Sequence, residues 1–402
     1  MKAQRIALFG NFGSVNLGNE GSLDAMVRFL RSKRPEAEII CICRDPKRVS
    51  KNHSIATHPL KRLWTAPRGV SLLDKLLLRI PSRILDLGHV WRIVRGIDVL
   101  LIPGTGILDD YQERPSEMPL ELFQWCGISA ILKRPILFVS VGAGPIRNRI
   151  SRLLMVSAAK LASYRSYRDA MSKAYLSAQG VDTSKDDVYP DLVFALPVID
   201  EAGAAQHDSA RTGIIGVGVM SYFGWISNNK RGHQIYSDYL EKISQFVEWL
   251  LSRGYGVRLL IGSESDNATV KAIRDRVAKR FGTPSAKSLL AEPAESLEEL
   301  MRQMKATDAI VATRFHNVVC ALKCAKPVLS ISYAGKNDEL LEKFGLADFV
   351  QQVENLNLEL LIRQFEKLEK DRVVLSTKIR GRIQLLQKSL DQQYAHLLDV
   401  LS

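Results

Sequence analysis

Short, almost wholly apolar runs alternate with longer amphipathic stretches along most of this chain. Uninterrupted apolar runs are typical of strands that a parallel sheet buries on both faces, and the amphipathic stretches between them are typical of covering helices. The runs occupy residues 5–10, 37–43, 98–104, 135–141 and 163–169 in the first half, and 213–219, 256–262, 308–314 and 327–332 in the second. The pattern therefore predicts an α/β fold with two doubly wound, Rossmann-like sheets.

Between the two sets of strands lies a stretch, residues 198–212, that has few large apolar side chains and is rich in Ala, Gly and Asp. A chain of 402 residues is also too long for one ordinary hydrophobic core. We therefore expect an N-terminal α/β domain at 1–197, a linker at 198–212, a C-terminal α/β domain at 213–354 and a helical segment at 355–402. Two such domains are similar to the two-lobed glycosyltransferase-B-like architecture, which has its active site in the cleft.

Glycines follow three of the predicted strands in the first half, in "GNFGSVNLGNEG" (10–21), "PGTGILDD" (103–110) and "VGAGP" (141–145). Their spacing is neither G-x-G-x-x-G nor that of a P-loop, so neither nucleotide fingerprint is supported. Because parallel strands bind ligands beyond their carboxyl ends, we expect these loops to contact substrate and either Asp109 or Asp110 to present a carboxylate. The candidate contact residues are Gly13, Asn16, Gly18, Gly104, Gly106 and Gly144.

An arginine and a histidine stand where the strand predicted at 308–314 gives way to a helix. Arg314 ends the strand and His316 begins the helix, whose free N–H groups favour anions. Arg168 ends the strand at 163–169 in a similar way, and Lys336 follows the last strand. We expect Arg314 to bind an anionic group, and Arg168 and Lys336 to do the same unless they are ordinary solvated side chains.

The formal net charge is +13, with 56 Lys and Arg against 43 Asp and Glu, and this excess points to an anionic partner. Residues 60–96 hold much of the excess. Leucines and tryptophans lie between their basic side chains, a pattern typical of a helix at a lipid interface. The alternative is a domain helix with one buried face and one solvated basic face. Nucleic acid is not expected as a partner, because no binding module is recognisable.

Five cysteines form no C-x-x-C pair, and their odd number indicates a reducing compartment. The first apolar run ends at Gly10, which is typical of a first strand and not of a signal peptide. No run approaches the ~18 apolar residues needed to cross a bilayer. We therefore expect a cytoplasmic protein, peripheral at the inner face of the membrane if residues 60–96 touch lipid. No metal-ligand spacing is visible, and no cofactor is expected.

Taken in order, the glycine loops, "SYRSYRDAMSKAYLSAQGV", "YPDLVFALP" and "TRFHNVVCALKCAKPVLSISYAGK" resemble the polysaccharide pyruvyltransferase family, roughly from Ile6 to Leu346. The last segment, Arg-x-His with an apolar helix, a Pro-led strand and Tyr-x-x-Lys, is the most specific. The resemblance implies transfer of the enolpyruvyl unit of phosphoenolpyruvate to sugar hydroxyls. The product would be a pyruvate ketal in an exopolysaccharide or cell-wall polymer.

The resemblance also assigns roles, with the first domain on the acceptor side and the second on the donor side. The matching positions are Arg314 and His316, Arg168 and Asp169, and Asp109 or Asp110. Phosphoenolpyruvate carries a carboxylate and a phosphate, so Arg314 and Arg168 would take one each, in either order. His316 would act as acid to the methylene or base to the hydroxyl, since histidine exchanges protons near neutrality. The acceptor is a saccharide or a lipid-linked oligosaccharide.

Two other functions compete with this one. A sugar-nucleotide-dependent glycosyltransferase would use Arg314 for the diphosphate, His316 as base, and Glu264 or Asp266 for the donor ribose. A non-catalytic protein that associates with polysaccharide or membrane would need none of these groups. The presence of Arg314, His316 and the acidic loop argues against the second.

Overall fold

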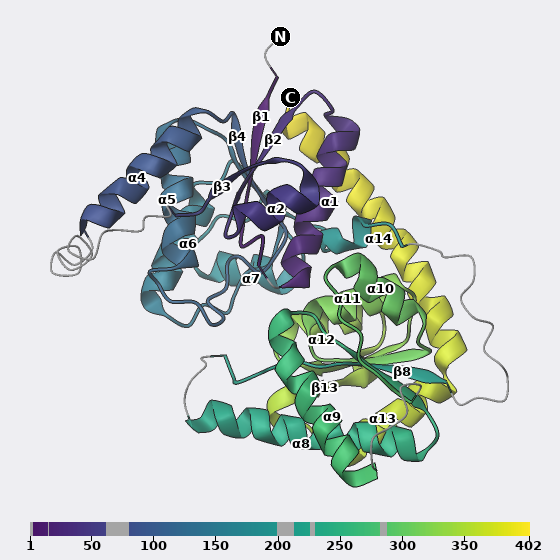
Figure 1. Cartoon of the computed structure of the whole chain (residues 1–402). Coiled ribbons are helices and arrows are strands. Elements are labelled where there is room, and N and C mark those ends of the chain that lie inside the picture. The colour runs from purple at the N-terminus through teal and green to yellow at the C-terminus, as the bar shows by residue number, and fades with distance from the viewer. Residues whose placement is uncertain (1–2, 15, 62–79, 199–212, 226–229, 282–287) are drawn as a thin grey trace. The chain divides into compact units, whose positions relative to one another are not determined.

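The computed structural model describes residues 3–14, 16–61, 80–198, 213–225, 230–281 and 288–402, and the chain divides into two compact units (Figure 1). Unit 1 comprises residues 1–14, 22–192 and 392–402, and unit 2 comprises residues 15–21 and 193–391. Each unit is built on one parallel sheet with helices on both faces, so the predicted α/β fold class is confirmed.

The sheet of unit 1 has seven strands in the order β3-β2-β1-β4-β5-β6-β7. Every pairing is parallel, and the chain order reverses between β1 and β4. Ligands bind at such a switch point, beyond the carboxyl ends of the strands. The strands are β1 (Arg5–Phe9), β2 (Glu38–Cys43), β3 (Ala56–Pro59), β4 (Val99–Pro103), β5 (Ile136–Val141), β6 (Tyr164–Tyr167) and β7 (Asp187–Val188).

Helices cover both faces of this sheet because alternate strand residues point to opposite sides. Ala7 and Phe9 of β1 belong to the core cluster that also holds Trp125 of α5 and Met155 of α6, all fully buried. On the other face, the ring of Phe29 in α1 stacks on the ring of Tyr394, near the C-terminus. The helices are α1 (Leu17–Lys33), α2 (Pro46–His53), α4 (Ile80–Arg95), α5 (Met118–Ile131), α6 (Arg149–Lys160) and α7 (Ala170–Ala178).

The sheet of unit 2 has six parallel strands in the order β10-β9-β8-β11-β12-β13, with its switch point between β8 and β11. The register pairs Ala312 with Gly218 at the carboxyl ends of these two strands. The strands are β8 (Ile214–Gly218), β9 (Gly256–Leu260), β10 (Leu289–Leu290), β11 (Ala309–Ala312), β12 (Val328–Ser332) and β13 (Val350–Gln352).

In unit 2, α8, α9 and α13 lie on one side of the sheet and α10, α11 and α12 on the other (Figure 1). Phe246 of α8 meets Phe365 of α13 edge-on, with ring centroids 5.6 Å apart. The helices are α8 (Lys230–Ser252), α9 (Asn267–Phe281), α10 (Leu297–Lys305), α11 (Phe315–Lys323), α12 (Gly335–Lys343), α13 (Leu358–Lys370) and α14 (Arg372–Val400), whose last turns belong to unit 1.

Some predicted segments lie largely outside the described residues. The linker at 198–212 is described only at Val198, and within 60–96 the stretch 62–79 is not described. The predicted helical segment at 355–402 contains α13 and α14. Within the described ranges, none of the helices has the length and apolar character required to span a bilayer.

Candidate active site

The carboxyl ends of β8 and β11 form the switch point of unit 2, and Thr313 and Arg314 follow β11 directly. Tyr239 of α8 ties the two strand ends together. Its hydroxyl accepts a hydrogen bond from Met220 N (3.3 Å) and shares another with Thr313 Oγ1 (2.9 Å). Burial raises the pKa of Tyr239, which keeps this hydroxyl protonated. The end of β11 is therefore a fixed platform for Arg314.

Asp266 orients the guanidinium of Arg314. Arg314 donates from Nε to Oδ2 and from Nη2 to Oδ1, the latter at 2.7 Å. The Asp266 carboxylate is fully buried and also accepts from the main-chain N–H groups of Ser221, Gly262 and Ser263. The Arg314 side chain retains 16% exposure. This bidentate pair fixes the guanidinium in one orientation while part of its surface stays accessible.

His316 is the second residue of α11, and its half-buried imidazole packs against the backbone of Gly18. A methyl group on Gly18 would overlap the imidazole at Nδ1, Cγ and Cε1. Leu17 N donates to Gly262 O at 3.0 Å, and Asn16 Oδ1 accepts from Gly18 N at 3.0 Å. The first turn of α1 is thus fastened to unit 2 and limits where the ring can lie. Substrate contact by Asn16 and Gly18 stays a prediction.

Lys336, in the first turn of α12, lies over two aromatic rings. Its Nζ is 5.1 Å from the ring centroid of Tyr333 and 5.8 Å from that of Phe315. The Phe315 ring in turn lies 5.2 Å from the imidazole of His316, nearly perpendicular to it. His316 and Lys336 therefore both lie against Phe315, the residue that follows Arg314 in the chain.

Arg168 follows β6 in unit 1, and its side chain is only 2% exposed. Its Nη1 donates to Asp191 Oδ2 at 3.0 Å, and its Nε lies 3.7 Å from Asp169 Oδ2. Asp169 also caps α7 by accepting from Ser172 N at 2.7 Å. A Cβ on Gly142 would come within 2.7 Å of the Arg168 guanidinium, so the cation lies directly on that backbone. The charge of Arg168 is balanced inside unit 1, and its binding of an anion stays a prediction.

The glycine loops of unit 1 have structural reasons for their glycines. Gly13, Gly104 and Gly144 have φ angles of +72°, +58° and +69°, a conformation that other residues adopt at a cost. The ring of Tyr175 lies on Gly144, where a Cβ would be 2.6 Å from it. These glycines are therefore required by the loop conformation, whether or not substrate also touches them.

The two neighbouring aspartates have different surroundings. Asp110 is 7% exposed and accepts from Arg147 N at 2.9 Å and Asn148 N at 2.8 Å, so it fastens the loop before α6. Asp109 is half-buried, and its Oδ2 lies over Gly106, 2.6 Å from where a Cβ would be. Asp109 is thus the carboxylate better placed to meet a solute.

Sequence reasoning missed the carboxylates that orient the two arginines. Asp191 and Asp266 lie 23 and 48 positions from Arg168 and Arg314, so no local spacing reveals them. Asp191 does stand in "YPDLVFALP", one of the segments that carry the family resemblance, and this was the available signal. Asp266, a candidate for ribose in the glycosyltransferase alternative, has its buried carboxylate engaged by Arg314 and the backbone.

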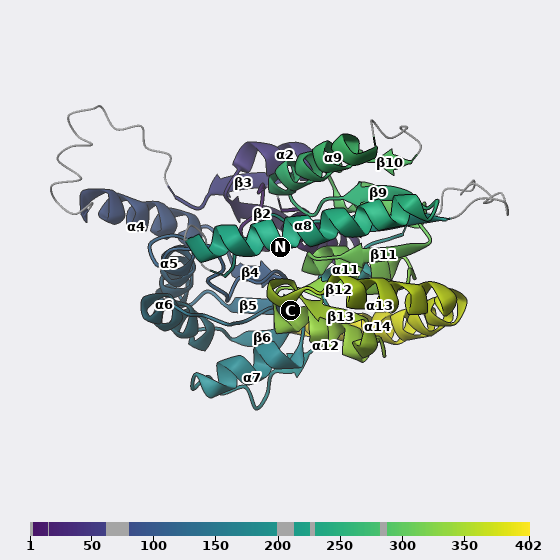
Figure 2. The same cartoon turned by 90° about the horizontal axis from the view of Figure 1, so that it is seen from below.

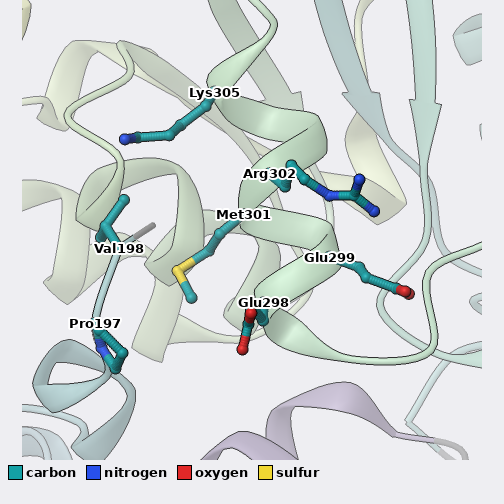
Figure 3. A pocket seen from close by; sticks show the side chains of 7 residues that line it. All are labelled: Pro197, Val198, Glu298, Glu299, Met301, Arg302 and Lys305. Carbon is teal, nitrogen blue, oxygen red and sulfur yellow. The ribbon is translucent and has the colours of Figure 1, made fainter. Parts of the chain in front are cut away.

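A pocket of about 250 Å³ lies along α10 in unit 2, next to Pro197 and Val198 (Figure 3). Glu298, Glu299, Met301, Arg302 and Lys305 line it. None of the predicted site residues reaches it, and its charged side chains have both signs. Among the described residues, no three His, Cys, Asp or Glu side chains gather as metal ligands do, and a metal-free reaction stays a prediction.

A sequence model of the family Polysaccharide pyruvyl transferase matches residues 16–335. Among solved structures, HepE of Anabaena in complex with UDP and glucose has a TM-score of 0.62 at 14% identity and covers 99% of both chains. MnaA of S. aureus with UDP has a TM-score of 0.60 at 13% identity, covering 94% of this chain and 90% of that one. The UDP-GlcNAc 2-epimerase of Methanocaldococcus jannaschii reaches 0.57 at 14% identity, covering 90% and 92%. Likeness at such identities shows the fold alone, which is glycosyltransferase-B-like.

Proposed function

The chain belongs to the polysaccharide pyruvyl transferase family, and on that premise we propose that it transfers the enolpyruvyl group of phosphoenolpyruvate to hydroxyl groups of a saccharide. The product is a pyruvate ketal, and phosphate is released. The observation that carries the proposal is the position of Arg314 and His316. They lie inside the matched stretch and stand together at the switch point of the second sheet.

Unit 2 supplies the groups for phosphoenolpyruvate in this proposal. Arg314, held in one orientation by Asp266, binds one of the two anionic groups, and the N–H groups at the start of α11 add donors. Lys336 is the better candidate for the second anionic group, because the charge of Arg168 is already balanced by Asp191. A lysine acts as a point charge and suits phosphate in any orientation.

His316 delivers a proton to the methylene carbon of the enol, and the neighbouring carbon becomes an oxocarbenium centre. A saccharide hydroxyl adds its oxygen to that centre and gives its proton to a carboxylate, for which we propose Asp109 of unit 1. A second hydroxyl then adds to the same carbon as the bond to phosphate breaks, its proton leaves on the departing phosphate, and the ketal ring closes. General acid–base steps of this kind contribute typically 10²–10⁴-fold each.

We place this reaction in the cytoplasm, on an intermediate of an exopolysaccharide or cell-wall polymer. All five cysteines are buried and none of them forms a disulfide, as suits a reducing compartment. A lipid-linked oligosaccharide is one form in which such an acceptor is presented.

The test is to incubate the protein with phosphoenolpyruvate and a panel of glycans and to measure phosphate release. We expect release that depends on both substrates and falls at least ~100-fold in His316→Ala. His233→Ala is the matched control, because His233 is an exposed histidine of the same unit outside the site. Equal loss in both variants, or undiminished release in His316→Ala, would contradict the assigned role.

The same panel is run with sugar nucleotides in place of phosphoenolpyruvate. The solved complexes of HepE and MnaA contain UDP, so the glycosyltransferase alternative is the one to measure directly. Turnover with sugar nucleotides alone would replace our proposal by that alternative. We expect little, since the buried carboxylate of Asp266 is already engaged by Arg314 and the backbone. Glu264 is then the remaining carboxylate for a ribose.

A further inference from the structure

Unit 1 exposes large apolar side chains on the outer surface of the layer formed by α4, α5 and α6. These helices lie side by side with α5 in the middle (Figures 1 and 2). Large apolar side chains are usually buried, and a group of them on one face marks an interaction surface. The exposed fractions are 41% for Leu87, 43% for Trp91, 67% for Ile131, 59% for Ile150 and 68% for Leu153.

These side chains are not left over from the packing of the core. On α6, Met155 is fully buried and Val156 is 8% exposed, so the inner face already supplies the core contacts. Ile150 and Leu153 are one turn apart on the opposite, outer side. The helix therefore has two apolar faces, and in the described residues of unit 1 only the inner one is covered.

Basic side chains surround the exposed apolar ones. On α6, Arg149 and Arg152 alternate with Ile150 and Leu153, and the helix contains no Asp or Glu. On α4, Trp91 is followed by exposed Arg92 and Arg95. In α5, Glu121 is the sole acid, and it is 4% exposed. α5 contributes no basic side chain, and α4 holds one acid, the half-buried Asp86 next to Leu87. The outer surfaces of α4 and α6 thus carry exposed apolar side chains together with arginines, and the basic side chains outnumber the acidic ones.

We propose that the outer face of α4, α5 and α6 docks on an anionic lipid bilayer. Apolar side chains enter the boundary between headgroups and acyl chains, while arginines beside them remain at the level of the phosphates. The sign of the charge selects lipid over a second copy of this chain. A symmetric dimer through this face would bring arginines against arginines.

This inference does not depend on the transferase reaction, and it rests only on described residues, so residues 62–79 play no part in it. It gives a concrete surface to a protein for which a lipid-linked oligosaccharide is one candidate acceptor. A membrane-bound layer would keep unit 1 at the plane in which such an acceptor diffuses.

The test uses the full chain with a single introduced cysteine, Leu153→Cys, labelled with an environment-sensitive fluorophore. All five native cysteines are buried, so labelling is selective. We expect a blue-shifted emission and quenching by brominated lipid when phosphatidylglycerol vesicles are added, and little change with phosphatidylcholine alone. Val373→Cys is the matched control, because Val373 is 73% exposed but lies on α14 in unit 2.

Vesicle co-sedimentation then tests the surface itself. Ile150→Ser with Leu153→Ser should lower binding roughly tenfold or more, and Arg149→Gln with Arg152→Gln should remove most of its salt dependence. Val373→Ser with Val374→Ser should bind as the unaltered chain does. Equal binding to neutral and anionic vesicles, or undiminished binding by both α6 variants, would overturn the proposal. The proposal would also be overturned if the unaltered chain did not bind vesicles and the Ile150→Ser, Leu153→Ser variant changed its oligomeric state.

Discussion

The two sheets end differently although their topology is alike. The loops that follow the strands of unit 1 contain several glycines, and Arg168 at the same sheet edge is 2% exposed in its pair with Asp191. At the same edge of unit 2, Arg314 is paired with Asp266 yet keeps 16% exposure, and His316 stands half-buried two positions later. The buried pair stabilises unit 1, and anion binding by Arg168 stays a prediction. The partly exposed and oriented Arg314 has surface available to a ligand. The two arginines thus differ in how much exposure their carboxylate partners leave them.

The largest expected effect comes from breaking the buried pair of Arg168 and Asp191. Asp191→Ala leaves a guanidinium buried without its nearest carboxylate, which costs about 3–5 kcal/mol in the free energy of unfolding. We expect faster amide hydrogen exchange in β6 and α7, the elements that flank Arg168. Exchange measured by mass spectrometry separates this loss from any change in unit 2.

Asp191→Asn is the matched control, because an amide oxygen still accepts a hydrogen bond from Arg168. It should recover part of the lost stability. If Asp191→Ala left exchange in unit 1 unchanged, the buried pair would not stabilise unit 1 as the 2% exposure of Arg168 implies.

The second effect concerns the positioning of His316. Gly18→Ala adds a methyl group where the imidazole lies, so the ring must move or the first turn of α1 must open. A misplacement of about 1 Å in a catalytic group costs up to about 100-fold in rate. We expect kcat to fall by that order while KM for phosphoenolpyruvate changes little. Alanine itself favours a helix over glycine by about 1 kcal/mol, so the loss would not come from helix propensity.

Gly127→Ala is the control, because a Cβ on this α5 glycine meets no other atom within 4 Å. The rate of diethylpyrocarbonate modification of His316, followed by peptide mass spectrometry, gives a readout that needs no turnover. Gly18→Ala should change that rate and Gly127→Ala should not. An unchanged rate in both variants would show that Gly18 does not position the ring.

The sheets themselves could be predicted from the sequence, because strands buried on both faces need uninterrupted apolar runs. Each of the nine predicted strands coincides with an observed one. The prediction missed the four edge strands of the two sheets, β3, β7, β10 and β13, where partial burial leaves no such run. The short helix after Arg314 was likewise predictable, since Pro327 marks its end.

The candidate site could be predicted only in part. The predicted strand end placed Arg314 and His316 at the carboxyl edge of the second sheet, and the strand order of the structure makes that position the switch point of unit 2. The carboxylates that orient the two arginines, Asp191 and Asp266, lie 23 and 48 positions away in the sequence. Local sequence patterns therefore cannot predict these pairs. The same limit applied to Asp109 and Asp110, whose different burial and hydrogen-bond partners adjacency in sequence could not reveal.

A third and smaller effect separates those two aspartates. Asp109→Asn should lower kcat about tenfold or more, because an amide cannot take the proton from a hydroxyl. Asp110→Asn should leave kcat nearly unchanged and lower the free energy of unfolding by about 1–3 kcal/mol, since it weakens the acceptor for Arg147 N and Asn148 N. The pair of variants is its own control. A reversed result would make Asp110 the reactive carboxylate.

The smallest effect is a pH dependence confined to unit 1. Burial lowers the pKa of His53, and the nearby Asp24 carboxylate, 3.9 Å from Nδ1, offsets this only in part. The folded state therefore binds the proton less readily than the unfolded state, whose histidine titrates near pH ~6.5. Stability falls as the pH drops below that value, and the loss is complete below the folded pKa.

His53→Gln should therefore reduce the difference between melting temperatures measured at about pH 8 and about pH 5.5. His396→Gln, which removes an exposed histidine of the same unit, should not. An equal reduction in both variants would assign the pH dependence to net charge and not to the buried imidazole.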